Sequence, residues 1–229
     1  MTHTFDMTVI YITANVVPDS FGIAAREILL EAIGELPLIS VSQKPLTFGH
    51  NINVGDSLRS HVNIYRQALI GADDATTEYI AIAEDDMLYS PAHFRYRPKH
   101  APFAYNLAYW GVYTWQDPPI YNYKGRKNFG VLICNRMAFI KAMEERFNKW
   151  PDETKVNLDH WAEPGKYERQ LGVTPQLTED FYTHPPNIKF SHENELSFAG
   201  LGTRKRAGEM RAYDIPHWGH INKIRRLYA

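Results

Sequence analysis

The chain of 229 residues contains one cysteine, Cys134, which excludes a framework of disulfide bonds within the chain. Cys134 stands in a short apolar run, where a small core residue is expected more often than a nucleophile. No apolar run approaches the roughly 20 residues of a membrane-spanning helix, and the first residues lack a basic stretch followed by an apolar one. We therefore expect a soluble, cytoplasmic protein without stable membrane insertion.

The chain also lacks a strong net charge, which is -1 at neutral pH. This balance excludes a general attraction to nucleic acids or acidic membranes, so such a partner would have to be met by a local patch. The last segment, residues 203–229, is such a patch, because it carries seven Lys and Arg residues against two acids, a net charge near +5. A solvated tail and a phosphate-binding segment both fit this composition.

The first ninety residues alternate between strand and helix patterns. Apolar or β-branched runs predict strands at 7–13, 38–41 and 80–83, and apolar residues at helical spacing predict helices at 23–33 and 58–70. Asp56 or Ser57 would cap the second helix, and the polar stretch 42–55 is expected to be a loop. Strands joined through helices by short connections indicate a doubly wound α/β sheet.

After residue 90 the pattern becomes irregular. Proline, aromatic and basic residues are scattered through 90–127, where only 105–115 resembles a strand, so this stretch is expected to form a wall rather than core. A strand at 128–134, containing Gly130, and an amphipathic helix at 136–150 follow. A helical piece at 166–171 and a strand near 188–191 precede an irregular C-terminal part.

Three consecutive acids, Glu84, Asp85 and Asp86, follow the apolar strand at 80–83. Such a strand is buried on both faces of a parallel sheet, and ligands bind at the carboxyl ends of these strands. Side chains alternate along an extended chain, so Glu84 and Asp86 should share one side and Asp85 the other. Carboxylate oxygens favour Mg²⁺ or Mn²⁺ carrying a phosphate. A solvated acidic turn is the alternative.

With these features in view, the segments 49–55, 63–72 and 75–86 resemble GT-A-fold glycosyltransferases and, more narrowly, small transferases encoded by bacteriophages. The acidic trio takes the place of the family's Asp-x-Asp motif. The resemblance implies a Rossmann-like, mostly parallel sheet flanked by helices, with an irregular C-terminal part. It also implies one domain over 1–229, with a nucleotide-binding half at 1–90, an acceptor-side half at 91–202 and the basic segment at 203–229.

The resemblance further implies roles for particular residues. Asp86 would bind Mn²⁺ or Mg²⁺, with a histidine as a further ligand; His192 is preferred to His217 and His220. Arg59 would reach the pyrophosphate, and Glu84 would face the ribose. The residues expected around the nucleotide sugar are Thr13, Asn15, Ser42, Gln43, Arg59, Glu84 and Asp85.

The implied reaction moves a sugar from a nucleotide sugar, expected to be a UDP-sugar, to an acceptor hydroxyl. An inverting enzyme needs a carboxylate to take the hydroxyl proton; Asp159 and Glu163 are the candidates, followed by Asp180. The preferred acceptor is a hydroxymethylated base in phage DNA, with Arg204, Lys205 and Arg206 on its phosphates. Alternatives are a polysaccharide or lipid-linked acceptor, a nucleotidyltransferase, and a non-catalytic nucleotide-binding module.

Overall fold

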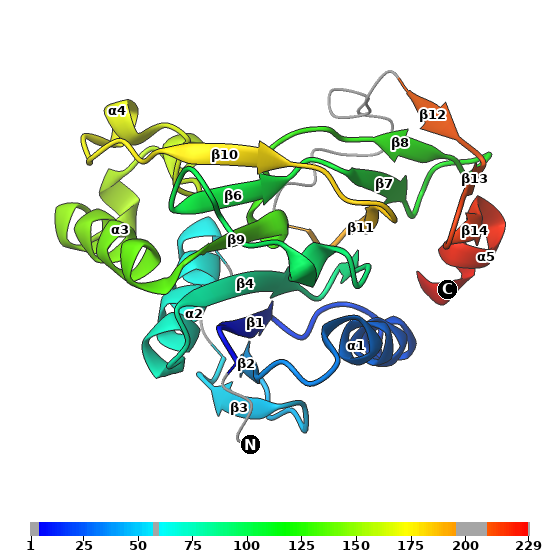
Figure 1. The fold of residues 1–229 in the computed structure, drawn as a ribbon, viewed down its shortest axis with the longest axis horizontal. Coiled ribbons are helices and arrows are strands. Elements are labelled where there is room, and N and C mark those ends of the chain that lie inside the picture. The colour runs from blue at the N-terminus through cyan, green and yellow to red at the C-terminus, as the bar shows by residue number, and fades with distance from the viewer. Residues whose placement is uncertain (1–4, 57–59, 196–209, 229) are drawn as a thin grey trace.

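A seven-stranded sheet forms the centre of the protein (Figure 1). The computed structural model describes residues 5–56, 60–195 and 210–228, except the side chain of Asp159. The strand order is β10-β6-β9-β4-β1-β2-β3, and four of the six neighbouring pairs are parallel. The strands are β1 (Met7–Thr13), β2 (Leu38–Ser42), β3 (His50–Asn53), β4 (Tyr79–Glu84), β6 (Phe103–Asn106), β9 (Leu132–Asn135) and β10 (Thr178–Phe181). The predicted mostly parallel α/β fold is confirmed.

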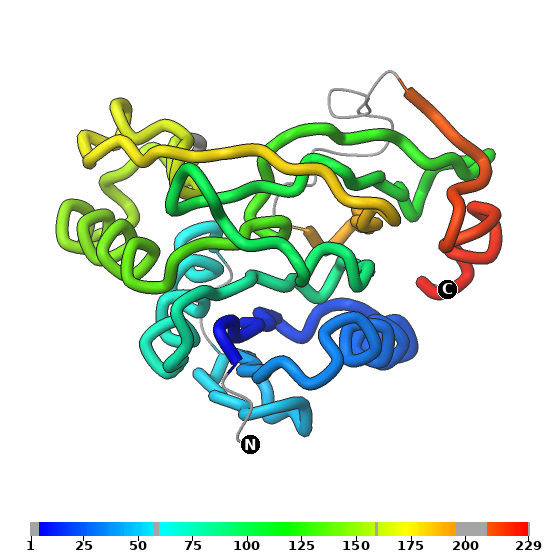
Figure 2. The backbone as a smooth tube through the Cα atoms, in the orientation of Figure 1, coloured from blue at the N-terminus to red at the C-terminus, as the bar shows by residue number. Residues whose placement is uncertain are grey.

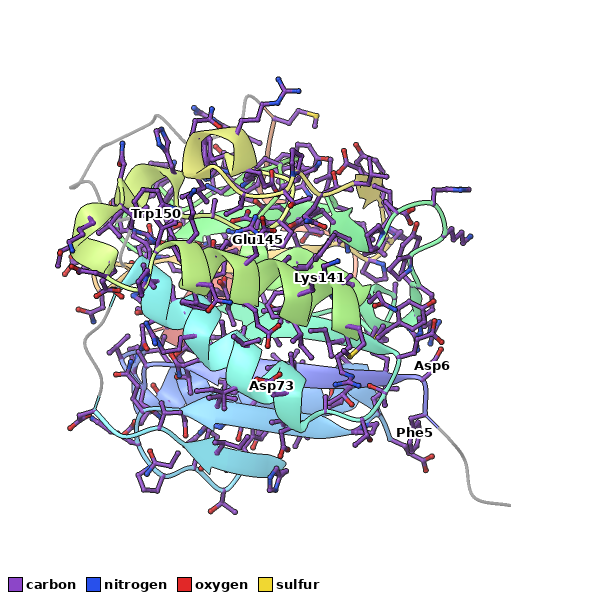
Figure 3. The ribbon with its side chains drawn as sticks, turned by 90° about the vertical axis from the view of Figure 1, so that its left-hand side faces the viewer. Phe5, Asp6, Asp73, Lys141, Glu145 and Trp150 are labelled. Atoms are coloured by element: carbon purple, nitrogen blue, oxygen red, sulfur yellow. The ribbon has the colours of Figure 1, made fainter. Side chains whose placement is uncertain are left out.

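Three long helices flank this sheet: α1 (Asp19–Ile33), α2 (His61–Asp74) and α3 (Arg136–Lys149). Figure 1 shows α2 and α3 on one side of the sheet and α1 on the other. Figure 3 shows α2 and α3 side by side, with Asp73, Lys141 and Glu145 labelled on them. The short helices are η1 (His93–Arg95), η2 (Phe129–Val131), η3 (Glu153–Lys155), η4 (Leu158–His160), α4 (Glu168–Leu171), α5 (Ile221–Arg225) and η5 (Arg226–Tyr228).

Local chemistry explains where the helices begin. The side chain of Ser60 accepts a hydrogen bond from the backbone N–H of Asn63, so Ser60 is the N-cap of α2, in place of the predicted Asp56 or Ser57. Pro18 precedes α1, which begins four residues before the predicted start at residue 23. Along β1 every residue is buried, as the continuous apolar run predicts for a central strand.

Residues 90–127 contribute to two cores, β6 to that of the central sheet and β7 and β8 to a second core at a second sheet, so the prediction of an irregular wall was wrong. A five-stranded sheet has the order β12-β8-β7-β11-β5. Its strands are β5 (Met87–Leu88), β7 (Tyr109–Tyr113), β8 (Tyr121–Tyr123), β11 (Asn187–Ser191) and β12 (Arg211–Ala212). Val112 and Tyr121 are fully buried there. Strands of two to five residues are too short for a visible alternation, and β11 pairs with β5 from about a hundred residues away.

The strand β3 was also missed, because 42–55 was predicted to be a loop. β3 lies parallel to β2, with Ile39 opposite His50. Only residues 43–49 connect them, whereas parallel neighbours are usually joined by a dozen residues or more. Because this connection is unusually short, the parallel pairing of β2 with β3 was not predicted.

The C-terminal segment folds back against α1 (Figure 2). The ring centroid of Phe21 in α1 lies 4.9 Å from that of Tyr228 and 4.7 Å from that of Phe190 in β11. A small antiparallel pair, β13 (Asp214–Ile215) and β14 (Gly219–His220), precedes α5. Among the described residues, no helix has the length and apolar character needed to cross a membrane.

Gly71 lets α2 approach the sheet. A Cβ atom at this position would lie 2.6 Å from Cγ2 of Ile10 and 3.2 Å from Cγ2 of Val41, both in buried strands. Gly71→Ala should therefore lower the free energy of unfolding by about 1–2 kcal/mol in urea denaturation, since overpacking exceeds the gain in helix propensity. Gly22→Ala in α1 is the matched control, because its Cβ would meet the flexible end of Arg26. Equal effects of the two changes would contradict this account.

The buried His93 gives the fold a dependence on pH. Its Nδ1 accepts a hydrogen bond from the Asn106 amide at 3.2 Å, and burial lowers the pKa of its ring from 6.5 to about 3. Below pH 6.5 the unfolded chain therefore takes up a proton that the folded chain does not, and stability falls as pH falls. Between pH 7 and pH 5, wild type should lose about 2 kcal/mol more than His93→Gln.

The measurement is the free energy of unfolding in urea across this pH range. His50→Gln is the control, since the side chain of His50 is 66% exposed. A difference between wild type and His93→Gln that stays constant with pH would contradict the prediction.

Candidate functional site

The chain reverses its direction across the sheet between β1 and β4. After β1 it adds β2 and β3 on one side, and then returns to place β4 on the other. Ligands of doubly wound sheets bind outside the carboxyl ends of the strands at such a point. Thr13 ends β1 and Glu84 ends β4, so the acidic trio begins at the switch point itself.

A cleft of about 540 Å³ lies at this edge of the sheet. Its size is within the range of small-molecule sites. Its polar and charged lining includes Thr13, Gln43, Glu84, Asp85, Asp86, Arg126, Lys127, Glu163, Lys166, Lys189 and His192. We call this the switch-point cleft.

Lys189 joins two of the three acids at the floor of the cleft. Its Nζ lies 2.7 Å from Oε2 of Glu84 and 2.8 Å from Oδ2 of Asp86. Asp85 points elsewhere and accepts a hydrogen bond from the hydroxyl of Thr13. Glu84 and Asp86 therefore share Lys189 while Asp85 contacts Thr13, but Asp85 and Asp86 stand in a turn between β4 and β5, not in the extended chain that the prediction assumed.

Burial and charge act together on these groups. Burial, reinforced by the neighbouring Asp86, raises the pKa of Asp85 to about 7, against the effect of the Thr13 hydrogen bond. Burial also raises the pKa of Glu84, which Lys189 opposes. For Lys189, burial alone would lower the pKa, but the two carboxylates outweigh it and hold the pKa well above its ordinary value. Lys189 is therefore a charged ammonium group.

Strand β11 of the second sheet places Lys189 in the cleft. In β11, Ile188 and Phe190 are fully buried in the second core, and Lys189 between them points to the opposite side. The strand pairs with β5, which directly follows the acids, and the backbone N–H of Phe190 donates to the carbonyl of Asp86 at 2.7 Å. Sequence reasoning missed Lys189. The signal was a lysine between apolar residues in the strand predicted at 188–191.

A divalent cation at Asp86 does not fit this arrangement. Bound to these acids, it would stand close to the ammonium group of Lys189, which already bridges Glu84 and Asp86, and two cations so close repel each other. Within the described part of the chain, no group of three or more His, Cys, Asp or Glu side chains is placed to hold a metal ion. His192 lines the same cleft, but its ring lies 5.4 Å from that of Tyr228. Mn²⁺ or Mg²⁺ at Asp86 and His192 remains a sequence-based prediction.

Four of the residues expected around the nucleotide sugar follow the first two strands, where the resemblance places the base, and they fall into two groups. Thr13 and Gln43 line the cleft, whereas Asn15 and Ser42 are absent from its lining. The side-chain oxygen of Asn15 accepts from the backbone N–H groups of Gln43 and Lys44 at 3.1 and 2.9 Å. Asn15 thus ties the end of β1 to the end of β2.

Glu163 is the predicted catalytic acid that the structure brings to the cleft. Its Oε2 accepts from the hydroxyl of Tyr65 at 3.0 Å, and its Oε1 accepts from Lys166 at 2.6 Å. Asp159 lies in η4, with its side chain outside the described part. Asp180 lies in β10, 3.7 Å from Lys127, and is not among the residues that line the cleft.

The remaining predicted residues are not brought to the cleft by the described structure. His217 and His220 are absent from its lining; His220 instead caps α5 by accepting from the backbone of Asn222. Arg59 and the basic residues Arg204, Lys205 and Arg206 lie outside the described residues. The positive charge that the described cleft does carry comes from Arg126, Lys127, Lys166 and Lys189.

Comparisons with known proteins find similar structures at low identity. The glycosyltransferase GlyE of Streptococcus pneumoniae TIGR4 in its apo form is 11% identical over 68% of this chain and 41% of its own, with a TM-score of 0.43. A glycosyltransferase involved in glycosylation of the major capsid of PBCV-1 is 11% identical over 80% and 92%, with a TM-score of 0.44. The inositol-1-phosphate CTP transferase of T. maritima is 11% identical over 82% and 91%, with a TM-score of 0.48.

The chain spans less than half the length of the two GlyE structures, 41% and 45%. No family model matches, and no curated protein matches. All three scores lie below 0.5, so these likenesses show no family, and the function is argued from the residues of the cleft.

Gly130 makes room for the carboxylate of Glu84. A Cβ atom there would lie 2.6 Å from Oε2 of Glu84 and 2.6 Å from Sδ of Met87. Gly130→Ala should displace this carboxylate from Lys189 and lower the free energy of unfolding by about 1–3 kcal/mol. Glu84→Asp, which is shorter, should recover part of this loss in the double variant.

Urea denaturation of the two single variants and the double variant gives the coupling between the positions. Strictly additive effects would show that Gly130 does not act through Glu84.

Proposed function

We propose that the chain is a glycosyltransferase that takes its sugar from a nucleotide sugar bound in the switch-point cleft. The observation that carries the proposal is the composition of this cleft. Carboxylates stand at the end of β4, beside the end of the parallel strand β1, and four cationic side chains line the same space. A nucleoside diphosphate needs cations for its phosphates and polar groups for its base.

The donor would lie across the switch point. Thr13 and Gln43 line the cleft at the ends of β1 and β2, on the side proposed for the base. The diphosphate would lie over the ends of β1 and β4, near Lys189, Arg126 and Lys127. A UDP-sugar is the first donor to test.

The acceptor side would lie at Glu163. A carboxylate offers about four lone-pair positions, and the two contacts with Tyr65 and Lys166 leave room for an acceptor hydroxyl. In an inverting transfer, the hydroxyl oxygen bonds to the anomeric carbon and its proton passes to Glu163. The bond from that carbon to the diphosphate breaks, and its electron pair leaves with the diphosphate.

For the acceptor we propose a hydroxymethylated base in DNA. Support comes from the charge of the C-terminal segment, near +5 over residues 203–229, and from the cationic lining of the cleft. A polysaccharide or lipid-linked hydroxyl is the alternative. Mass spectrometry of each acceptor after incubation with a panel of nucleotide sugars distinguishes them through the mass of one added sugar.

The first test is release of nucleoside diphosphate from the same panel, run in parallel with and without Mn²⁺. Asp86→Asn should reduce the rate by roughly 10²–10³-fold, because it removes one of the two carboxylates that hold Lys189 in place. Asp6→Asn is the matched control. Asp6 is also ion-paired, at 2.7 Å from Arg97, but precedes the opposite end of β1.

Undiminished release by Asp86→Asn would contradict the proposed site. Release of pyrophosphate from a nucleoside triphosphate, with no release from nucleotide sugars, would indicate a nucleotidyltransferase instead.

A further inference from the structure

Lys189 occupies the position at which a nucleotide-dependent transferase of this kind is expected to hold a divalent cation. We propose that the ammonium group of Lys189 is the cation that receives the donor's diphosphate, so that sugar transfer proceeds without a divalent metal. This inference rests on the proposed function, which it deepens by assigning the diphosphate to a particular group.

The geometry of the ammonium group leaves one donor for a ligand. An ammonium carries three N–H donors. Among the described residues, the Nζ of Lys189 lies 2.7 Å from Oε2 of Glu84, 2.8 Å from Oδ2 of Asp86 and 3.0 Å from Oδ1 of Asp86. Its side chain is 16% exposed and lines the cleft. One donor to Glu84 and one donor shared between the two oxygens of Asp86 would leave the third for a phosphate oxygen on the side that faces the cleft.

The ammonium is held in place by the backbone as well as by the acids. Lys189 stands in a strand that is paired on both sides, with Met87 opposite it in β5 and Gly111 opposite it in β7. The next residue, Phe190, donates its N–H to the carbonyl of Asp86. Both the charge and its carboxylate partners are thus preorganised, which is the arrangement that stabilises a leaving group most effectively.

A divalent cation and Lys189 would compete for the same oxygens. The cation would have to displace the ammonium from Glu84 and Asp86, and two cations at contact distance repel strongly away from bulk water. Asp85 offers no alternative pair, because its carboxylate accepts from Thr13 on the other side of the chain. We therefore expect Lys189, and not a divalent cation, to be bound by these two carboxylates.

Other side chains supply the charge that one ammonium lacks relative to a divalent ion. Arg126, Lys127 and Lys166 line the same cleft. As the bond between the anomeric carbon and the diphosphate breaks, negative charge collects on the leaving oxygen. Lys189 then strengthens its hydrogen bond to the phosphate without giving up its proton, and the acceptor's proton goes to the carboxylate base.

The metal test uses the protein alone. Mn²⁺ is titrated into wild type, Lys189→Met and Lys189→Arg, and bound ion is followed by electron paramagnetic resonance. Wild type and Lys189→Arg should bind Mn²⁺ weakly, whereas Lys189→Met frees both carboxylates and should bind at least tenfold more tightly. Lys155→Met is the matched control, because Lys155 pairs with Asp152 at 3.4 Å but is 75% exposed. It should bind as wild type does.

The activity test follows release of nucleoside diphosphate in EDTA and in Mn²⁺. The rates of wild type in the two buffers should agree within about twofold. Lys189→Met should lose roughly 10²-fold in EDTA and regain at least tenfold in Mn²⁺. Lys189→Arg keeps the charge and should retain more activity in EDTA than Lys189→Met. Thermal melting of each variant shows that it is folded.

Three results would overturn the inference. They are release by wild type that depends on Mn²⁺, binding of Mn²⁺ by wild type as tight as by Lys189→Met, and an undiminished rate of Lys189→Met in EDTA. Any of these leaves the proposed function standing. If no nucleoside diphosphate binds and no nucleotide sugar is cleaved in either buffer, the proposed function itself fails, and the role of Lys189 toward a diphosphate fails with it.

Discussion

The two sheets are linked by the ion pairs of Lys189 with Glu84 and Asp86, and the candidate site depends on these ion pairs. Lys189 of β11 bridges Glu84 and Asp86 at the end of β4, while the backbone of Phe190 bonds to that of Asp86. Removing one partner of such a buried network would leave an uncompensated charge, at a cost of about 3–5 kcal/mol. The contact therefore fixes both the register of the second sheet and the positions of the acids.

This link between the two sheets also explains why the cleft contains both acidic and basic side chains. The acids come from the switch point of the large sheet, where strand ends converge. Lys189 comes from the second sheet, and Arg126 and Lys127 come from the connection between β8 (Tyr121–Tyr123) and η2 (Phe129–Val131). Like charges from one strand are thus offset by cations from remote segments, which is what a site for an anionic ligand requires.

The parts of the fold that the sequence predicted correctly are those governed by local pattern. β1 and β4 are continuous apolar runs, and α3 carries its apolar residues at helical spacing, so each could be placed from its own residues. The strand β3 and the second sheet could not. Their strands are short, and their pairing partners lie far away or across an unusually short connection, so the signal is in the tertiary contacts.

The sequence by itself determined the α/β class and the position of the acids at the end of a buried strand, because these follow from the hydrophobic pattern. It also put forward Glu163, which the structure brings to the cleft. Only the tertiary structure decided what lies between Glu84 and Asp86. Lys189 is more than a hundred residues away, and a lysine in an apolar strand reveals its partner only when pairing of β11 with β5 sets which side it faces.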